Sequence, residues 1–280
     1  MSNKRALLLS LLVSLLWVSA SFGQTREEVL RVDGARPVGE AVLELTRNYP
    51  VTVTYEDPRY EFEGDLRDIT NRKNPNAPDR RVLVPRGGNL EVRFNVLVET
   101  NRPTDLAGTL TEILEYHRLS GFPGHFAILQ TGEAFHIVPT EVRGANGRWI
   151  PQTSIMATPI TIKAQEINGF DAVDLVADKV EEGIGIFVGI AIGRCCANAV
   201  LGSTIQLEAN AEPARDVLLR TLQSIAKDRL TWGLNYAADT QRYYLNLRAV
   251  PAQPSPVTFD FEPSRSGKSF FDRPEPAPDQ

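Results

Sequence analysis

Three histidines, His117, His125 and His136, are the side chains of this sequence best suited to acid–base chemistry. Near neutral pH a histidine can take up or release a proton, or bind a metal ion. His125 and His136 lie on the two arms of a predicted hairpin around Thr131-Gly132, so they could lie near each other. A site there needs a third ligand or a carboxylate, and the sequence supplies no clear candidate. His117 falls on the apolar face of a predicted helix, where a packed histidine is expected.

Cysteines and glycines give no stronger indication of chemistry. Cys195 and Cys196 are adjacent, and we expect two small residues at a strand end, with a redox or intermolecular role as the alternative. No ligand spacing typical of zinc follows them. The glycines of Gly183–Gly189 follow a predicted helix and open a strand, the reverse of a dinucleotide-binding loop, so we expect them to end that helix. We predict no catalytic residue, no cofactor and no metal.

Charged and aromatic residues gather in a long stretch, Asp57–Gly88, without a helical or strand period. Long loops in compact domains are often functional or mobile. One interpretation is a solvated surface of mixed charge. The alternative is a region that contacts a protein partner, for which Arg59, Tyr60 and Phe62 are the candidate contact residues.

The first 23 residues predict a secretory signal peptide, because Lys4 and Arg5 precede an apolar run that ends in small residues. Cleavage after Ala20 or Gly23 fits the pattern; an uncleaved anchor is the alternative. The run is shorter than the roughly 20 residues that cross a bilayer, and no other run is long enough. Loss of the two positive charges takes the net charge from −5 to −7, which argues against nucleic acid as a partner.

Four segments share one pattern, a strand followed by an amphipathic helix and a further strand. Pro37 suits the first turn of the first helix, and Thr104 is the expected N-cap of the second. The second and fourth segments match best, since each ends in two strands joined by a short turn. The predicted helices begin at about Pro37, Thr104, Gly169 and Pro213.

This repetition predicts an α+β fold with two modules, each with helices packed on a small mixed sheet. After Val250 the sequence is rich in proline and charge, which is typical of a disordered tail. Aromatic pairs in that tail could form a docking motif: Phe259 with Phe261, and Phe270 with Phe271. The predicted parts are a signal peptide (1–23), a first module (24–144), a linker (145–156), a second module (157–250) and the tail (251–280).

Three stretches resemble a known family. Residues 36–56, RPVGEAVLELTRNYPVTVTYE, resemble the start of the short N-terminal domain of secretins and TonB-dependent transporters, and residues 105–139 resemble its second half. Residues 213–247 resemble that second half again. The resemblance implies two strand–helix–strand units in a small sandwich, located in the periplasm and mediating protein contacts without catalysis.

The leading hypothesis is therefore an exported, periplasmic module that binds or scaffolds an envelope protein. The second is a periplasmic small-molecule binder with a pocket between the halves, lined by Trp149, Trp232 and Tyr236. The third is an envelope hydrolase in which His125 and His136 converge with a carboxylate. The sequence leaves the oligomeric state and the partner open.

Overall fold

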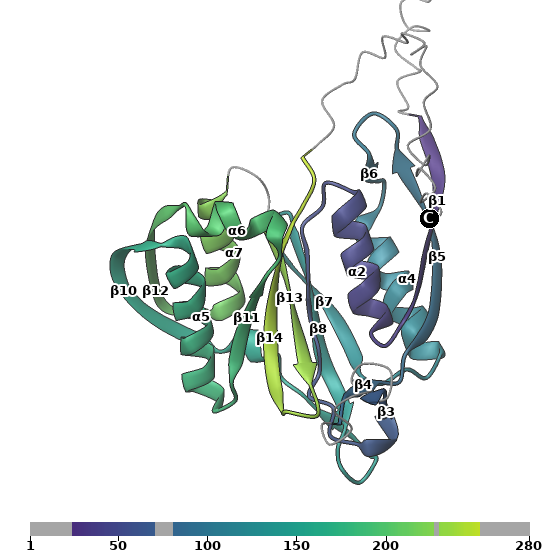
Figure 1. The fold of residues 1–280 in the computed structure, drawn as a ribbon. Coiled ribbons are helices and arrows are strands. Elements are labelled where there is room, and N and C mark those ends of the chain that lie inside the picture. The colour runs from purple at the N-terminus through teal and green to yellow at the C-terminus, as the bar shows by residue number, and fades with distance from the viewer. Residues whose placement is uncertain (1–23, 71–80, 227–229, 253–280) are drawn as a thin grey trace, which may run out of the picture.

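A computed structural model describes residues 24–70, 81–226 and 230–252 of the chain. It shows the α+β fold that the sequence predicts, with five helices and several sheets in the described part, the largest of which is mixed. Figure 1 shows the layers: an outer ribbon of strands, a pair of helices, a central sheet, a second pair of helices and a second outer ribbon. The expected signal peptide and the four tail phenylalanines lie outside the described residues.

The first unit is built from two strand–helix–strand segments. Strands β1 and β5 form an antiparallel ribbon, and helices α2 and α4 lie between that ribbon and the central sheet (Figure 1). Leu45, Leu110 and Ile113 are buried between these layers. Its elements are β1 (Thr25–Gly34), α2 (Pro37–Asn48), β2 (Val53–Glu56), β5 (Gly88–Leu97), β6 (Arg102–Pro103), α4 (Leu106–Leu119), β7 (His125–Thr131) and β8 (Ala134–Arg143).

The second unit repeats this arrangement. Strands β10 and β12 form its ribbon, and helices α5 and α7 lie between that ribbon and the central sheet. Gly185, in the left-handed region at φ 68°, ends α5 as the sequence predicts. Its elements are β10 (Pro159–Asn168), α5 (Gly169–Ile184), β11 (Val188–Ile192), α6 (Arg194–Leu201), β12 (Thr204–Pro213), α7 (Ala214–Ile225), β13 (Leu230–Ala237) and β14 (Arg242–Ala249).

The strand pairing of the two units is the same. In the first, β2 runs parallel to β8, which pairs antiparallel with β7. In the second, β11 runs parallel to β14, which pairs antiparallel with β13. The second and fourth sequence segments therefore correspond, β5–α4–β7–β8 with β12–α7–β13–β14.

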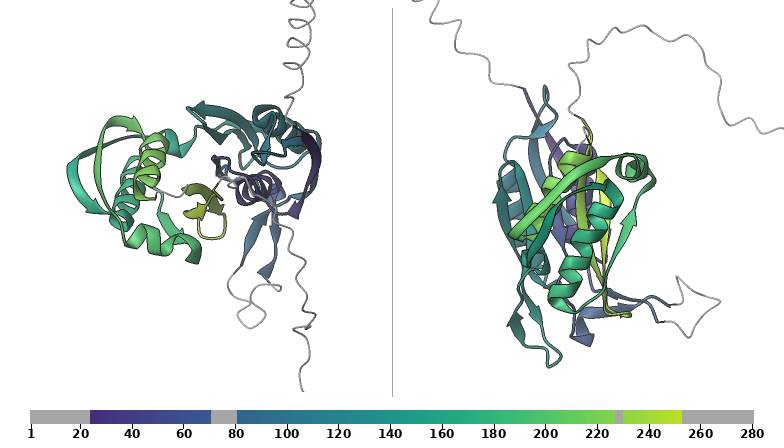
Figure 2. Two further views of the ribbon diagram at one scale, coloured as in Figure 1. Left: turned by 90° about the horizontal axis from the view of Figure 1, so that it is seen from above. Right: turned by 90° about the vertical axis from the view of Figure 1, so that its left-hand side faces the viewer.

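The two units share one central sheet, with the strand order β11-β14-β13-β2-β8-β7. The sequence predicts a sheet in each module; instead, β13 pairs with β2 and joins the two sets of strands. Because β13 runs parallel to β2, the second unit is turned over relative to the first. Its helices therefore cover the opposite face of the sheet, as the view from above shows (Figure 2).

The shared sheet explains why β2 is buried along its whole length. Val53 and Tyr55 face the helices of the first unit, and Thr54 and Glu56 face the second unit. The strand pattern of alternating residues predicts that Val53 and Tyr55 share a face, which is confirmed. It gives no sign that the opposite face is covered too, because threonine and glutamate are typical of an exposed face.

Three local predictions differ from the structure. Asp105, not Thr104, is the N-cap of α4, and its carboxylate accepts a hydrogen bond from the Gly108 amide. Cys196 is buried in helix α6 instead of a strand end. The predicted linker is packed: β9 (Trp149–Pro151) pairs with the end of β8, and a short 3-10 helix follows it.

The long segment after β2 is partly ordered into a hairpin. A 3-10 turn leads into β3 (Leu66–Asp68), which pairs antiparallel with β4 (Leu83–Pro85). This hairpin projects from the body of the molecule in Figures 1 and 2. Residues 71–80 lie outside the described residues.

Candidate functional site

Asp57, directly after β2, is the centre of a buried polar cluster. Its carboxylate accepts hydrogen bonds from the Tyr55 hydroxyl at 2.6 Å and the Tyr236 amide at 2.9 Å, and it forms an ion pair with Arg36. Arg36 also donates to the Tyr236 carbonyl at 2.7 Å. Asp57 therefore ties the start of α2 and the end of β2 to β13, so its role is to hold the two units together.

Glu56, the preceding residue, is a second buried carboxyl group. It accepts hydrogen bonds from the Ser154 hydroxyl at 2.5 Å and the Ile155 amide at 2.6 Å. Burial raises the pKa of Glu56 to about 7, although these hydrogen bonds favour its charged form. A carboxyl group with such a pKa could exchange protons near neutral pH, but Glu56 is fully buried. It fixes the segment after β9 to the central sheet.

His125 and His136 do not converge. Along the hairpin, His125 lies opposite Glu141, and His136 lies opposite Leu129. These positions are four residues apart on β7, or about 13 Å at the usual strand rise. The predicted hydrolase site at these two residues is therefore wrong.

His136 and His117 have separate packing roles. His136 is buried with its Nδ1 2.8 Å from the Thr54 hydroxyl, and burial lowers its pKa to about 4. His117 lies against the rings of Phe122 and Phe126, and burial lowers its pKa to about 4 as well. The prediction that His117 is a packed histidine is confirmed.

The three candidate contact residues of the long segment have different environments. Tyr60 is buried and belongs to the core of the second unit, so its ring cannot meet a partner in this conformation. Arg59 is partly exposed; its amide donates to Gln152 at 3.1 Å, and its guanidinium lies 3.5 Å from Glu61. Phe62 is half-buried beneath Arg143.

Phe62 is part of an aromatic and cationic cluster that we call the Trp149 surface: Phe62, His125, Arg143, Trp149 and Ile150. The His125 and Trp149 rings stack with centroids 3.9 Å apart. The Arg143 guanidinium carbon lies 5.2 Å from the Trp149 centroid and 5.6 Å from the Phe62 centroid. Trp149 and Ile150 are 41% and 39% exposed, so large apolar side chains face solvent beside a positive charge.

The acidic neighbours of this surface hold it in place. Arg143 forms an ion pair with Asp65 at 2.9 Å, and His125 Nδ1 lies 2.8 Å from Glu141. Strands β7, β8 and β9 and the 3-10 turn before β3 supply these residues, so their side chains are positioned by ordered backbone. The sequence does not point to Arg143, His125 or Ile150 as members of this surface; for Arg143, the alternation of β8 is the available signal.

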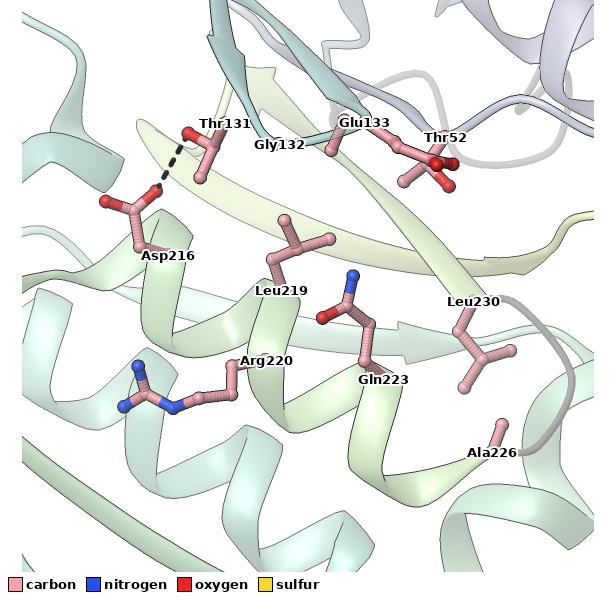
Figure 3. Close-up of a pocket in the computed structure, with 11 residues that line it drawn as sticks. Thr52, Thr131, Gly132, Glu133, Asp216, Leu219, Arg220, Gln223, Ala226 and Leu230 are labelled. Atoms are coloured by element: carbon pink, nitrogen blue, oxygen red, sulfur yellow. Dashed lines mark hydrogen bonds between the residues drawn. The ribbon is translucent and has the colours of Figure 1, made fainter.

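The predicted small-molecule pocket does not form from its expected residues. Trp232 and Tyr236 are buried in the central sheet, whereas Trp149 is on the surface. A groove of about 600 Å³ does lie at the seam, between α7 and the turn from β7 to β8 (Figure 3). The Thr131 hydroxyl bridges it by donating to Asp216 at 3.5 Å. Its lining contains no aromatic residue, unlike most small-molecule sites.

The described residues give two further findings. They contain no group of three or more His, Cys, Asp or Glu side chains placed to hold a metal ion. None of their helices combines the length and the apolar character needed to span a membrane. Comparison with models of protein families, with curated proteins and with solved structures finds no significant match to this chain.

Proposed function

We propose that this chain is an exported, non-catalytic module that binds or scaffolds a protein of the cell envelope, and that the Trp149 surface is its contact. The observation that carries the proposal is the exposure of Trp149 within a cluster of stacked and charged side chains. Tryptophan and arginine are enriched among the residues that dominate the binding energy of protein interfaces.

The arrangement favours binding because it is already ordered. Trp149 stacks on His125, and Arg143 lies between the Trp149 and Phe62 rings while it pairs with Asp65. A partner would meet rings whose conformations are restricted, so association costs less side-chain entropy than with mobile side chains.

Export and the family resemblance support the cellular part of the proposal. The first 23 residues have the pattern of a secretory signal peptide. Each unit contains two strand–helix–strand segments, which is the arrangement that the resemblance to the short N-terminal domain of secretins and TonB-dependent transporters implies. Cell fractionation tests this part: the proposal requires the chain in the periplasm, and retention in the cytoplasm contradicts it.

The contact is tested by co-purification from envelope extract with the tagged full chain. Trp149→Ala should remove the partner or weaken its retention at least tenfold, because loss of such a residue typically costs about 2 kcal/mol or more of binding free energy. Leu201→Ala is the matched control, since Leu201 is an exposed apolar residue of the second unit. Equal retention by both variants would contradict the site. Arg59 and the tail residues Phe259, Phe261, Phe270 and Phe271 stay predicted contacts, and truncation after Ala252 tests the tail.

A further inference from the structure

The joint between the two units shows how this fold extends its own sheet. At the joint, β13 of the second unit pairs in parallel with β2 of the first, Gly233 with Tyr55 and Leu234 with Glu56. The Asp57 amide donates to the Leu234 carbonyl at 2.8 Å. The strands at the two ends of the central sheet, β7 and β11, are the counterparts of β13 and β2. The free edge of β7 therefore corresponds to the edge of β13 that pairs at the joint, and the free edge of β11 corresponds to that of β2.

The registers of the two units make this correspondence specific. The parallel pair of the first unit begins with Val53 opposite Phe135, and that of the second unit with Val188 opposite Tyr243. Following the pairing across each hairpin, Ala127 takes the place of Gly233, and Ala191 takes the place of Glu56. The joint thus maps onto a pairing of Ala127 and Ile128 of one copy with Ile190 and Ala191 of another.

The faces of β2 and β11 that point away from the helices of their own unit differ in burial: the face of β2 is covered, and that of β11 is exposed. Thr54 and Glu56 are fully buried because the second unit covers that face of β2. On β11 the corresponding face, with Gly189 and Ala191, is bare apart from Phe187 and Arg242. Ala191 is exposed, and the Phe187 ring, which lies over Gly189 with the Arg242 guanidinium carbon 5.0 Å from its centroid, is still 44% exposed. Such a face, with a large exposed ring, can accept a cover.

Helix α4 of a second copy can supply this cover, because α4 corresponds to α7, which lies beside Thr52 at the internal joint. Helices α4 and α7 start at equivalent positions, and Thr111, Glu115 and Arg118 of α4 correspond to Leu219, Gln223 and Ala226 of α7. The α7 residues line the groove of about 600 Å³ between the two units, and Thr52 and the turn between β7 and β8 border its far side (Figure 3).

The α4 residues line a smaller groove of about 280 Å³, which only α4 and β7 border among the described residues. This groove includes the apolar side chains Leu114, Phe126 and Ile128. The position of Thr52 corresponds to that of Phe187, so the exposed Phe187 ring of a second copy would enter it.

Apart from a register irregularity between His125 and Phe126 at the start of β7, neither end strand carries the features that normally prevent edge pairing. Natural sheets protect their edges with charged residues, prolines or bulges. Phe126–Thr131 of β7 and Val188–Ile192 of β11 contain no charged residue and no proline. Both edges are therefore open to strand addition, a common mode of protein recognition.

We propose that the partner of these edges is a second copy of this chain, which adds its β11 in parallel to β7 and places Phe187 in the α4–β7 groove. Such a contact is heterologous, so each added copy leaves a free β7 and a free β11, and assembly is open-ended. The Asp57 cluster that strengthens the internal joint has no counterpart at β11, because the register places the apolar Ile192 at the position of Asp57. The contact between copies is consequently weaker than the internal joint and reversible.

Sedimentation velocity of the purified full chain tests the proposal. The weight-average mass should rise with protein concentration without reaching a plateau at the dimer. Thr111→Lys places a charge in the α4–β7 groove, and Ala191→Lys places one on the bare face of β11. Each should raise the dissociation constant at least tenfold, because a long charged side chain would have to be buried in the contact. Leu201→Lys, an exposed site of the second unit, should associate like the wild type.

Mixing the two blocked variants distinguishes a head-to-tail contact from a symmetric one. Thr111→Lys keeps a usable β11, and Ala191→Lys keeps a usable β7, so their mixture should form a one-to-one dimer and nothing larger. A wild type that stays monomeric at high concentration overturns the proposal. So does a mixture that stays monomeric, or a single variant that still dimerises, since that points to pairing of like edges.

Discussion

The buried carboxyl group of Glu56 gives the protein a specific pH dependence. Folding raises the pKa of Glu56 from 4.5 to about 7. The folded protein therefore binds a proton between pH 4.5 and 7 that the unfolded chain releases. The stability that this proton contributes is fully present below pH 4.5 and is lost as the pH rises through 7, with a magnitude of about 3 kcal/mol.

Glu56→Gln tests this directly. Glutamine has the same shape, and its amide can still meet the Ser154 hydroxyl and the Ile155 amide at the positions of the two carboxyl oxygens. It has no proton to lose, so the free energy of unfolding of the variant, relative to wild type, should increase by about 3 kcal/mol between pH 4.5 and pH 8. Urea titrations at each pH measure this difference.

When the pH profile of the free energy of unfolding of the variant is compared with that of the wild type, the contributions of all other titrating groups cancel. Glu112→Gln is the matched control, because Glu112 is exposed on α4, and its profile should run parallel to that of the wild type. A Glu56→Gln profile that also runs parallel to the wild type would refute the assignment of a protonated, buried Glu56 at the joint of the two units.

Three further substitutions test the packing around the joint, each by urea unfolding. Asp57→Asn leaves Arg36 without its ion pair and should lower the free energy of unfolding by about 3 kcal/mol. A loss below about 1 kcal/mol would contradict the role of Asp57 in holding the two units together. His136→Gln should remove about 3 kcal/mol of the destabilisation that acid causes, because the lowered pKa of His136 makes stability fall as pH drops from 6.5 to 4; identical acid profiles contradict this. Gly39→Ala should cost about 1–3 kcal/mol, since its methyl group would lie 2.7 Å from the Tyr55 ring; an unchanged stability means that the ring moves freely.

The sequence predicts the local elements well because each helix has a clear apolar stripe. The stretch Pro37–Asn48 is helical over the predicted range, and the repeat of two strand–helix–strand segments per unit is present. The correspondence of the second and fourth segments is visible from the order of helix, hairpin and turn alone. These features depend on residues close in the sequence, so periodicity is sufficient to find them.

The joint and the Trp149 surface could not be predicted, because both depend on contacts between distant residues. Asp57 meets Tyr236 across 179 positions, and Glu56 meets Ser154 across 98. Two adjacent acidic residues at a strand end are typical of a solvated turn, and nothing local shows that a second unit buries them. Trp149 stacks on His125 only because β9 pairs with the end of β8, within a stretch whose composition is typical of a linker.

Site-specific photo-cross-linking in living cells tests most directly whether the Trp149 surface contacts an envelope protein. A photoreactive residue at Ile150, beside Trp149, should give a discrete adduct with one envelope protein, and Trp149→Ala in the same chain should abolish it. The same residue at Leu201 should not give that adduct. No adduct at Ile150, or the same adduct from both positions, would contradict this contact.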